Sequence, residues 1–198
     1  MFIETERLIV RTCRAEDAAA LYRIKMDPQV VEYCPDFLER NTGEEDIRGF
    51  IENFIRMEAQ GDIDSWRCYA IENRETGAVM GCVTFSKNAM LHEYELGWMM
   101  LSQYTKKGYA SEAAQAFAEY FCAAYGVDYL IVVMDVDNPA SYHAAEKCGF
   151  KLFEKRMVYD YHYNRYGDDY YYFRRYAAGC TLREKYYGDV PYTGRGAE

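Results

Sequence analysis

The feature that most constrains the fold is a short, almost continuously apolar stretch between two helical patterns. The stretch is Tyr129–Asp135 (YLIVVMD), which is typical of a strand buried on both faces. A helical pattern precedes it at Tyr109–Tyr125 and another follows at Pro139–Lys147, with Asn138 as a suitable N-cap and Gly149 after the last turn. A buried strand between two helices predicts a sheet that carries helices on both faces.

The rest of the chain supplies further strands and helices. The other strand patterns are residues 6–12, expected at a sheet edge, 66–73, 78–86 and 93–101, and a final hairpin of 157–163 and 170–176 around 164–169. The other helical patterns are residues 16–26, a short turn opened by Asp27-Pro28, and a helix that follows a capping box of Thr42 with Glu45 and ends at Gly61. The order predicts an α/β fold (an α+β mixed sheet) in one domain of residues 1–176, followed by a partly mobile extension, 177–198.

Composition argues against several classes of protein. No stretch approaches the roughly 20 apolar residues of a membrane span, and the first ten residues carry charges where a signal peptide needs an apolar core. The net charge of −9 disfavours nucleic acid and anionic membranes as partners and mildly favours a cationic substrate. The 7 cysteines lack C-x-x-C spacing and the 3 histidines are scattered. These features predict a cytoplasmic protein with reduced thiols and no metal site.

The segment most suggestive of chemistry is the strand–loop–helix EYELGWMMLSQYTKKGYASEA, which begins at Glu93. Its loop holds Lys106, Lys107 and Gly108 and leads directly into a helix that begins Tyr109-Ala110-Ser111, of which the last two are small. Unpaired N–H groups at a helix N-terminus attract anions, and glycine allows a phosphate to approach the backbone. The segment is neither a Walker A loop nor a G-x-G-x-x-G motif. From these residues alone, a plain loop with solvated lysines is the simpler interpretation.

Three motifs in the same order resemble the GNAT superfamily of N-acetyltransferases, in the branch of the ribosomal-protein N-terminal (alanine) acetyltransferases. Glu4–Pro35 is similar to the start of that branch. The loop that contains Gly108 is similar to the family's acetyl-CoA motif, Q/R-x-x-G-x-G/A, and residues 138–150 (NPASYHAAEKCGF) are similar to its next helix. The resemblance covers about residues 2–175. Thr105 departs from the Q/R position, and Ala145 stands where many relatives carry a tyrosine.

The resemblance implies transfer of acetyl from acetyl-CoA to an amine, with no metal cofactor. It also implies that the strands 93–101 and 129–135 are parallel and splay apart, so that the cofactor's pantetheine arm pairs with their backbone. The residues that would bind the cofactor are Met99, Met100, Leu101, Lys106, Lys107, Gly108, Tyr109, Ala110, Ser111, Asn138 and Ser141.

The acceptor must be a neutral amine when it attacks, so a general base is useful. Glu93 and Glu95 share a strand face, and Glu95 lies nearer the expected thioester position, so Glu95 is the preferred base. A backbone N–H near Met99 or Met100 would stabilise charge on the thioester oxygen. Ser141 is the candidate proton donor to the departing thiolate, with Tyr142 and His143 as alternatives.

The end of the chain is rich in tyrosine. More than half of the 21 tyrosines lie in residues 157–198, and the hairpin alone carries Tyr159, Tyr161, Tyr163, Tyr170, Tyr171 and Tyr172. Tyrosine suits sheet packing and protein interfaces. We therefore expect packing together with a homodimer contact, in preference to ligand recognition.

Three functions remain open at this point. The first is an N-acetyltransferase whose acceptor is a protein N-terminus, an amino acid, a polyamine or an aminoglycoside-like amine. The second is a non-catalytic acyl-CoA-binding sensor or interaction module. The third is a tyrosine-rich interaction protein that binds no acetyl-CoA.

Overall fold

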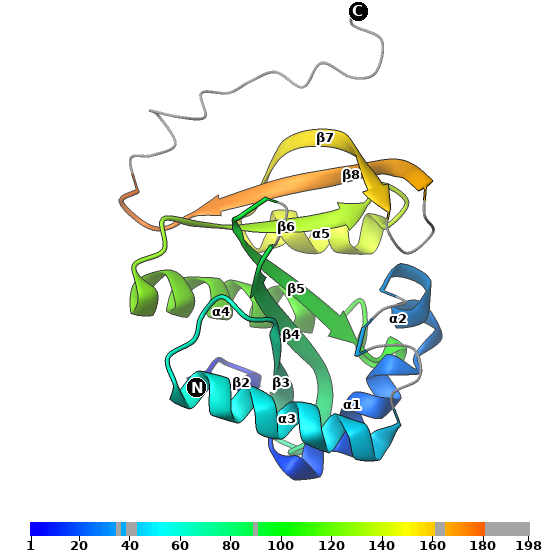
Figure 1. Cartoon of the computed structure of the whole chain (residues 1–198), viewed down its shortest axis with the longest axis vertical. Helices are drawn as coiled ribbons and strands as arrows, with labels where there is room; N and C mark the ends of the chain where they lie inside the picture. Colours follow the sequence, from blue (N-terminus) through cyan, green and yellow to red (C-terminus); the bar gives the residue numbers. More distant parts are fainter. Residues whose placement is uncertain (35–36, 39–42, 89–90, 161–164, 181–198) are drawn as a thin grey trace, which may run out of the picture.

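The chain folds around one mixed sheet, seen in a computed structural model (Figure 1). The model describes residues 1–34, 37–38, 43–88, 91–160 and 165–180, and the side chains of 156–171 are outside this description. The strands are β1 (Phe2–Glu4), β2 (Leu8–Thr12), β3 (Arg67–Asn73), β4 (Val79–Lys87), β5 (Tyr94–Met100), β6 (Tyr129–Asp135), β7 (Lys151–Asp160) and β8 (Arg165–Tyr176). The helices are α1 (Ala18–Lys25), α2 (Pro28–Tyr33), α3 (Glu44–Ala59), α4 (Tyr109–Tyr125) and α5 (Pro139–Lys147), with 3-10 turns η1 (Ala15–Asp17) and η2 (Ser102–Tyr104). Among these described helices, none combines the length and apolar character that crossing a bilayer requires.

The sheet runs in the order β1-β2-β3-β4-β5-β6-β8-β7, and its neighbours are antiparallel except at the centre. There β5 and β6 run parallel and pair at one position, Glu95 with Ile131. By contrast, β4 and β5 pair continuously from Gly81–Met100 to Lys87–Tyr94. Beyond Glu95, β5 and β6 diverge, and Figure 1 shows β6, β8 and β7 set apart from β5. This confirms the predicted mixed sheet with a splayed parallel pair.

Apolar side chains fill both faces of the sheet, as predicted. On one face, Phe117 and Phe121 of α4 lie one helical turn apart and pack on Phe85 of β4, with 3.9 Å between the ring centroids of Phe85 and Phe121. On the other face, α1 and α3 bury Leu21, Ile24, Ile47, Ile51 and Phe54. Burying each such side chain contributes roughly 1.5–3 kcal/mol, so the helices hold the sheet firmly even where β5 and β6 separate.

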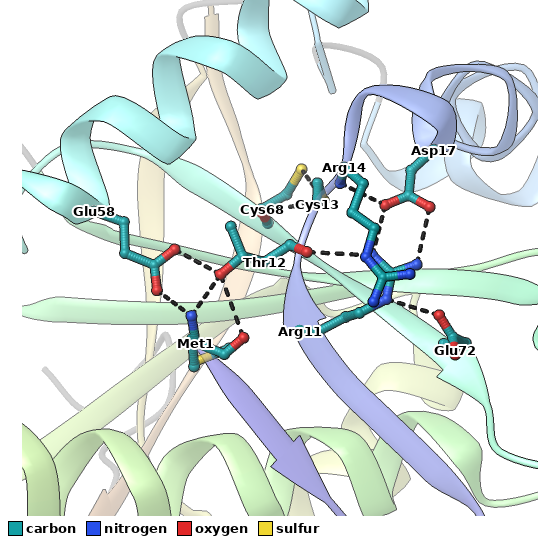
Figure 2. Close-up of polar contacts among 9 residues, drawn as sticks. All are labelled: Met1, Arg11, Thr12, Cys13, Arg14, Asp17, Glu58, Cys68 and Glu72. Carbon is teal, nitrogen blue, oxygen red and sulfur yellow. Dashed lines mark hydrogen bonds and ion pairs between the residues drawn. The ribbon is translucent and has the colours of Figure 1, made fainter.

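A buried polar network anchors α1 and α3 to the sheet (Figure 2). The Arg11 guanidinium of β2 lies 2.7 Å from Asp17 Oδ2 and 2.7 Å from Glu72 Oε2, and Arg11 is only 4% exposed. Asp17 also accepts the backbone N–H of Arg14 at 2.7 Å, and Thr12 Oγ1 donates to Glu58 Oε2 of α3 at 2.6 Å. A buried charge persists only where partners satisfy it. The network therefore fixes where α1 begins, and through α1 it fixes the start of α2.

Two features at the start of the chain differ from the sequence prediction. The strand predicted at the sheet edge, β2, is covered by β1, which pairs with it from Phe2–Arg11 to Glu4–Ile9. Three residues are too few to show an alternating pattern, so the sequence did not reveal β1. In addition, α3 has Gly43 at its N-cap, where Asp46 Oδ2 accepts the Gly43 N–H at 2.8 Å. The predicted cap Thr42 lies outside the described residues.

The final hairpin forms as predicted, but its strands are longer. They pair from Lys151–Arg174 to Asp160–Arg165, so residues 165–169 continue β8 instead of forming the predicted turn. Backbone pairing along the whole of β7 outweighs the weak strand propensity of these polar residues. Tyr172 is buried, at 2% exposure. The side chains of Tyr159, Tyr161, Tyr163, Tyr170 and Tyr171, and residues 181–198 of the predicted extension, lie outside the described residues.

Candidate active site

The separation of β5 from β6 leaves one edge of β5 without a strand partner beyond Glu95, while the other edge stays paired with β4. The Leu101 N–H donates to the Met80 carbonyl at 3.0 Å, on the β4 side. Because backbone groups alternate along a strand, the N–H and C=O of Trp98 and Met100 point the other way, toward β6. Because β5 and β6 pair only at Glu95, β6 does not bond to these groups of Trp98 and Met100. An extended chain that carries amides can pair with them in the manner of an added strand.

The N-terminus of α4 forms one wall of this gap. Gly108 is the N-cap with φ 81°, and Lys106 has φ 60°, so both residues are in the left-handed region, which lysine seldom adopts. The first helical bond runs from the Glu112 N–H to the Gly108 carbonyl at 3.0 Å. The N–H groups of Tyr109–Ser111 therefore have no acceptor within the helix. Such groups, at the positive end of the helix dipole, favour an anion.

The start of α5 forms a second wall. Asn138 caps the helix as predicted, since its Oδ1 accepts the Ser141 N–H at 3.0 Å. The Ser111 hydroxyl of α4 donates to the Ala144 carbonyl of α5 at 3.4 Å. This bond joins α4 to α5, the helices that follow the diverging strands β5 and β6.

A cavity of about 790 Å³ lies between these elements, within the usual range for small-molecule sites. Of the predicted binding residues, its wall includes Met99, Met100, Lys106, Gly108, Tyr109, Ala110, Ser111, Asn138 and Ser141. Leu101 and Lys107 are not part of this wall, as far as the described residues define it. The Leu101 N–H already bonds to Met80, and Lys107 Nζ lies 5.8 Å from the centre of the Tyr104 ring.

Helix α2 forms a third wall, although none of its residues was among the predicted site residues. Its N-cap, Asp27, accepts the Gln29 N–H at 3.1 Å and the Ser102 N–H at 2.8 Å, which connects the helix to the end of β5. At its other end, the Tyr33 hydroxyl donates to the Asp137 carbonyl at 3.1 Å, just beyond β6. Helix α2 therefore reaches both diverging strands, and residues 29, 30 and 32–34 line the cavity.

We expect Asp27→Ala to lower the free energy of unfolding by about 1 kcal/mol at pH 7, because it removes the α2 cap and the contact with Ser102. Burial alone would raise the pKa of Asp27. Hydrogen bonds from Ser102 and Gln29 lower it by a larger amount, so the pKa lies below its usual value. Its stabilising effect is therefore present above about pH 4 and is lost as the pH falls through the folded-state pKa.

Urea denaturation over a range of pH measures this effect. The control Ser102→Ala removes only the hydroxyl bond to Asp27 and should cost less than Asp27→Ala. A variant Asp27→Ala as stable as the wild type at pH 7 would show that the α2 cap contributes nothing.

Glu95, the predicted base, lies at the apex of the gap, where β5 and β6 make their one pair. Its side chain is partly buried, and Asn88 Nδ2 donates to its Oε2 at 2.7 Å. Burial raises the pKa of Glu95 more than the Asn88 bond lowers it. A carboxylate with a raised pKa is a better proton acceptor near neutral pH. Glu95 shares its strand face with Met99, which lines the cavity, but Glu95 itself lies just beyond the wall.

Glu93, the alternative base, is held in a structural ion pair. Its Oε1 lies 2.8 Å from Arg174 Nη2 and accepts the Tyr129 hydroxyl at 2.7 Å, and the Tyr172 hydroxyl donates to its other oxygen. The side chains of Glu93 and Arg174 are 13% and 6% exposed. This arrangement joins the start of β5 to β6 and β8, and it favours Glu95 over Glu93 as a base.

The candidate proton donors differ in their access to the cavity. Ser141 and His143 line it, and His143 Nδ1 lies 3.3 Å from Glu146 Oε2. Tyr142 instead packs edge-on against Phe173, with 5.0 Å between ring centroids. Ala145 is fully buried. Among the residues that the model describes, no group of three or more His, Cys, Asp or Glu side chains could hold a metal ion.

These geometric features agree with the comparisons with known proteins. Residues 7–151 match the family model of the acetyltransferase (GNAT) domain. The chain belongs to the GNAT acetyltransferase family. It is 30% identical over 175 residues to the uncharacterized N-acetyltransferase YnaD of Bacillus subtilis, covering 87% of this chain and 95% of YnaD.

Solved GNAT structures share the fold. An acetyltransferase of the GNAT family from Bacillus anthracis is 29% identical, with a TM-score of 0.72 and coverage of 89% of this chain and 98% of that one. The ribosomal L7/L12 α-N-protein acetyltransferase RimL, in complex with coenzyme A, has a TM-score of 0.74 at 18% identity, again covering 89% and 98%. As a GNAT member, the protein is an acetyl-CoA-dependent acyltransferase.

The wall of this GNAT cavity is electrically uneven. Lys106 precedes α4, and His143 and Lys147 lie one turn apart on α5, with Lys147 at its last residue. Both lysines therefore lie on the side of the cavity that α4 and α5 form. Glu32, on α2, also lines the cavity and is exposed. The spacing of His143 and Lys147 is a signal that sequence reasoning could have used. Glu32 was not among the predicted site residues, because no local pattern shows which residues of α2 face the cavity.

Proposed function

We propose that this acetyltransferase transfers the acetyl group of acetyl-CoA to a primary amine that attacks the thioester directly. One observation carries the proposal: the gap beside Trp98 and Met100 opens into the same cavity as the N-terminus of α4 and the face of α2. A donor and an acceptor can therefore meet at the open end of β5.

The residues present fit acetyl-CoA, which supplies an acetyl group activated as a thioester. The backbone groups of Trp98 and Met100 suit the amides of the pantetheine arm. Lys106, Gly108 and the N–H groups of Tyr109–Ser111 suit the pyrophosphate, with Asn138 and Ser141 on the facing wall. The coenzyme A bound in the RimL structure supports this placement, since the two proteins share a fold.

The chain's own groups can serve each proton transfer. Glu95, which lies outside the cavity wall, accepts a proton from the amine through one water as the N–C bond forms, and then releases it to solvent. A backbone N–H of Trp98 or Met100 stabilises the negative charge that develops on the carbonyl oxygen. As the C–S bond breaks, Ser141 donates a proton to the departing thiolate and recovers one from solvent. A thiolate leaves readily, so the contribution of Ser141 is the smaller one.

The acceptor enters beside α2 in this proposal. The anionic donor belongs with Lys106 and Lys147, whereas Glu32 on α2 favours an approaching cation. RimL acts on the N-terminus of ribosomal L7/L12, so a protein N-terminus is one candidate acceptor, and small amines are the other.

Acetyl-CoA turnover with a panel of amines tests the proposal. The panel should hold N-terminal peptides, amino acids, polyamines and aminoglycosides, with thiol release and the mass of the product as readouts. We expect kcat/KM to rise with pH, because both Glu95 and the amine must lose a proton before attack, and the pKa of Glu95 is already raised. Binding of acetyl-CoA with no turnover on any amine would instead support a non-catalytic acyl-CoA sensor.

A further inference from the structure

The turn between β1 and β2 reaches across to the first turn of α4. Glu112 of α4 accepts three hydrogen bonds there: from Thr5 Oγ1 at 2.6 Å, from the Arg7 backbone N–H at 3.0 Å, and from Arg7 Nε at 2.7 Å. Arg7 Nη1 also donates to the Lys107 carbonyl at 3.1 Å. About 100 residues of sequence separate Arg7 from these partners. A turn at the sheet edge is therefore fastened to the loop proposed to hold the pyrophosphate.

Arg7 contacts Lys107 and Tyr109 and lies beside Gly108 between them. Besides the Lys107 carbonyl, its guanidinium carbon lies 4.6 Å from the centre of the Tyr109 ring, and a Cβ placed on Gly108 would lie 3.5 Å from its Nη2. The loop needs such support, because Lys106 adopts a left-handed conformation that costs a lysine of order 1 kcal/mol or more. Fixing the Lys107 carbonyl fixes the peptide plane that carries the Gly108 N–H.

Arg7 also compensates a charge. A Glu112 carboxylate in the first turn of α4 would repel a pyrophosphate bound at the same helix end. Burial alone would raise the pKa of Glu112. Hydrogen bonds from Thr5 and Arg7 lower it by a larger amount, so the carboxylate is ionised at neutral pH. The Arg7 guanidinium lies 2.7 Å from Glu112 Oε2 and offsets this charge.

We propose that Arg7 is a positioning residue for the donor: acting through Lys107 and Glu112, it holds the N–H groups of the α4 loop in place and offsets the Glu112 charge. Among the described residues that line the cavity, Arg7 is not included, so it would act without touching the donor. The inference rests on the proposed function, because it assigns the pyrophosphate to this loop.

The test compares two donors, acetyl-CoA and S-acetylpantetheine, which lacks the pyrophosphate. For Arg7→Met we expect KM for acetyl-CoA to rise about tenfold, with KM for S-acetylpantetheine and kcat changed less than about twofold. Arg7→Lys should recover only part of the loss, since lysine lacks the guanidinium fork. The matched control is Arg74→Ala, which removes the bonds to the Thr5 and Glu6 carbonyls and the ion pair with Glu4 at the same turn; among the described residues, Arg74 has no hydrogen bond or ion pair to the loop. It should leave both KM values unchanged.

Equal losses for both donors, or an equal loss in Arg74→Ala, would overturn the proposal and leave Arg7 with a purely structural role. Hydrogen exchange supplies a readout that is independent of activity. The amides of residues 107–111 should exchange faster in Arg7→Met and not in Arg74→Ala, and unchanged exchange would also overturn the proposal. If the wild type binds no coenzyme A, the proposed function fails, yet the exchange experiment still decides whether Arg7 holds the loop.

Discussion

Glu95→Gln is expected to lower kcat about 100-fold at pH 7 while leaving the Kd of acetyl-CoA unchanged, since it removes the proton acceptor and keeps the side-chain shape. Its stability should not fall. Because burial raises the pKa of Glu95, the favourable contribution of this group is complete below its unfolded-state pKa of about 4.3 and is lost as the pH rises through the folded-state pKa. A neutral glutamine avoids that loss and can still accept the bond from Asn88.

The matched variant is Glu93→Gln, two residues earlier on the same side of the sheet. It replaces the carboxylate that pairs with the buried Arg174 at 2.8 Å, so we expect a loss of about 3 kcal/mol in the free energy of unfolding. Steady-state kinetics, calorimetric titration with acetyl-CoA and urea denaturation separate the two cases. An unchanged kcat in Glu95→Gln would remove Glu95 from the mechanism. A large loss of stability there would make it a structural residue like Glu93.

Gly81→Ala is expected to lower the free energy of unfolding by about 2–3 kcal/mol and to raise KM for acetyl-CoA several-fold. Gly81 of β4 lies opposite Met100, and an added Cβ would overlap the Met99 carbonyl oxygen and approach Met100 Sδ. The Met99 oxygen belongs to the backbone, so β5 itself must shift. That shift displaces Trp98 and Met100 where they face the gap.

Gly49→Ala is the control for this substitution. Gly49 is an exposed residue within α3, and a Cβ there meets nothing within 4 Å. Alanine should therefore stabilise the helix by about 1 kcal/mol with no change in KM. Thermal denaturation and donor titration of both variants measure these differences. If Gly81→Ala were as stable as the wild type, the close contact between β4 and β5 would not constrain the site.

Local sequence patterns were enough to predict most of the architecture. The bounds of α4, β6 and α5 match the predicted ranges, because Tyr129–Asp135 is apolar throughout and Asn138, Pro139 and Gly149 mark the ends of a helix. Elements with weak local patterns were not predicted. A strand as short as β1 has no period to detect, and the polar residues 165–169 join β8 only because β7 pairs with them.

The candidate site was predictable where it follows the chain and not where distant segments meet. The loop residues around Gly108 and the cap Asn138 line the cavity, and their contact with the cofactor stays a prediction. The contributions of α2 and Arg7 depend on contacts between residues about 70–105 positions apart, such as Ser102 with Asp27 and Arg7 with Glu112. No local period records such contacts. The role of Glu93 was likewise hidden, since its partner Arg174 lies 81 residues away.

The single bridge between Glu95 and Ile131 has a mechanical consequence. The strands β1–β5 and the strands β6–β8 form two halves of the sheet that pair at this one position. A donor lying beside Trp98 and Met100 would add a strand between the two halves. Each catalytic cycle would then stiffen the molecule when the donor enters and loosen it when coenzyme A departs. On this proposal, the sheet would be completed when the donor binds and opened again when coenzyme A leaves, once per turnover.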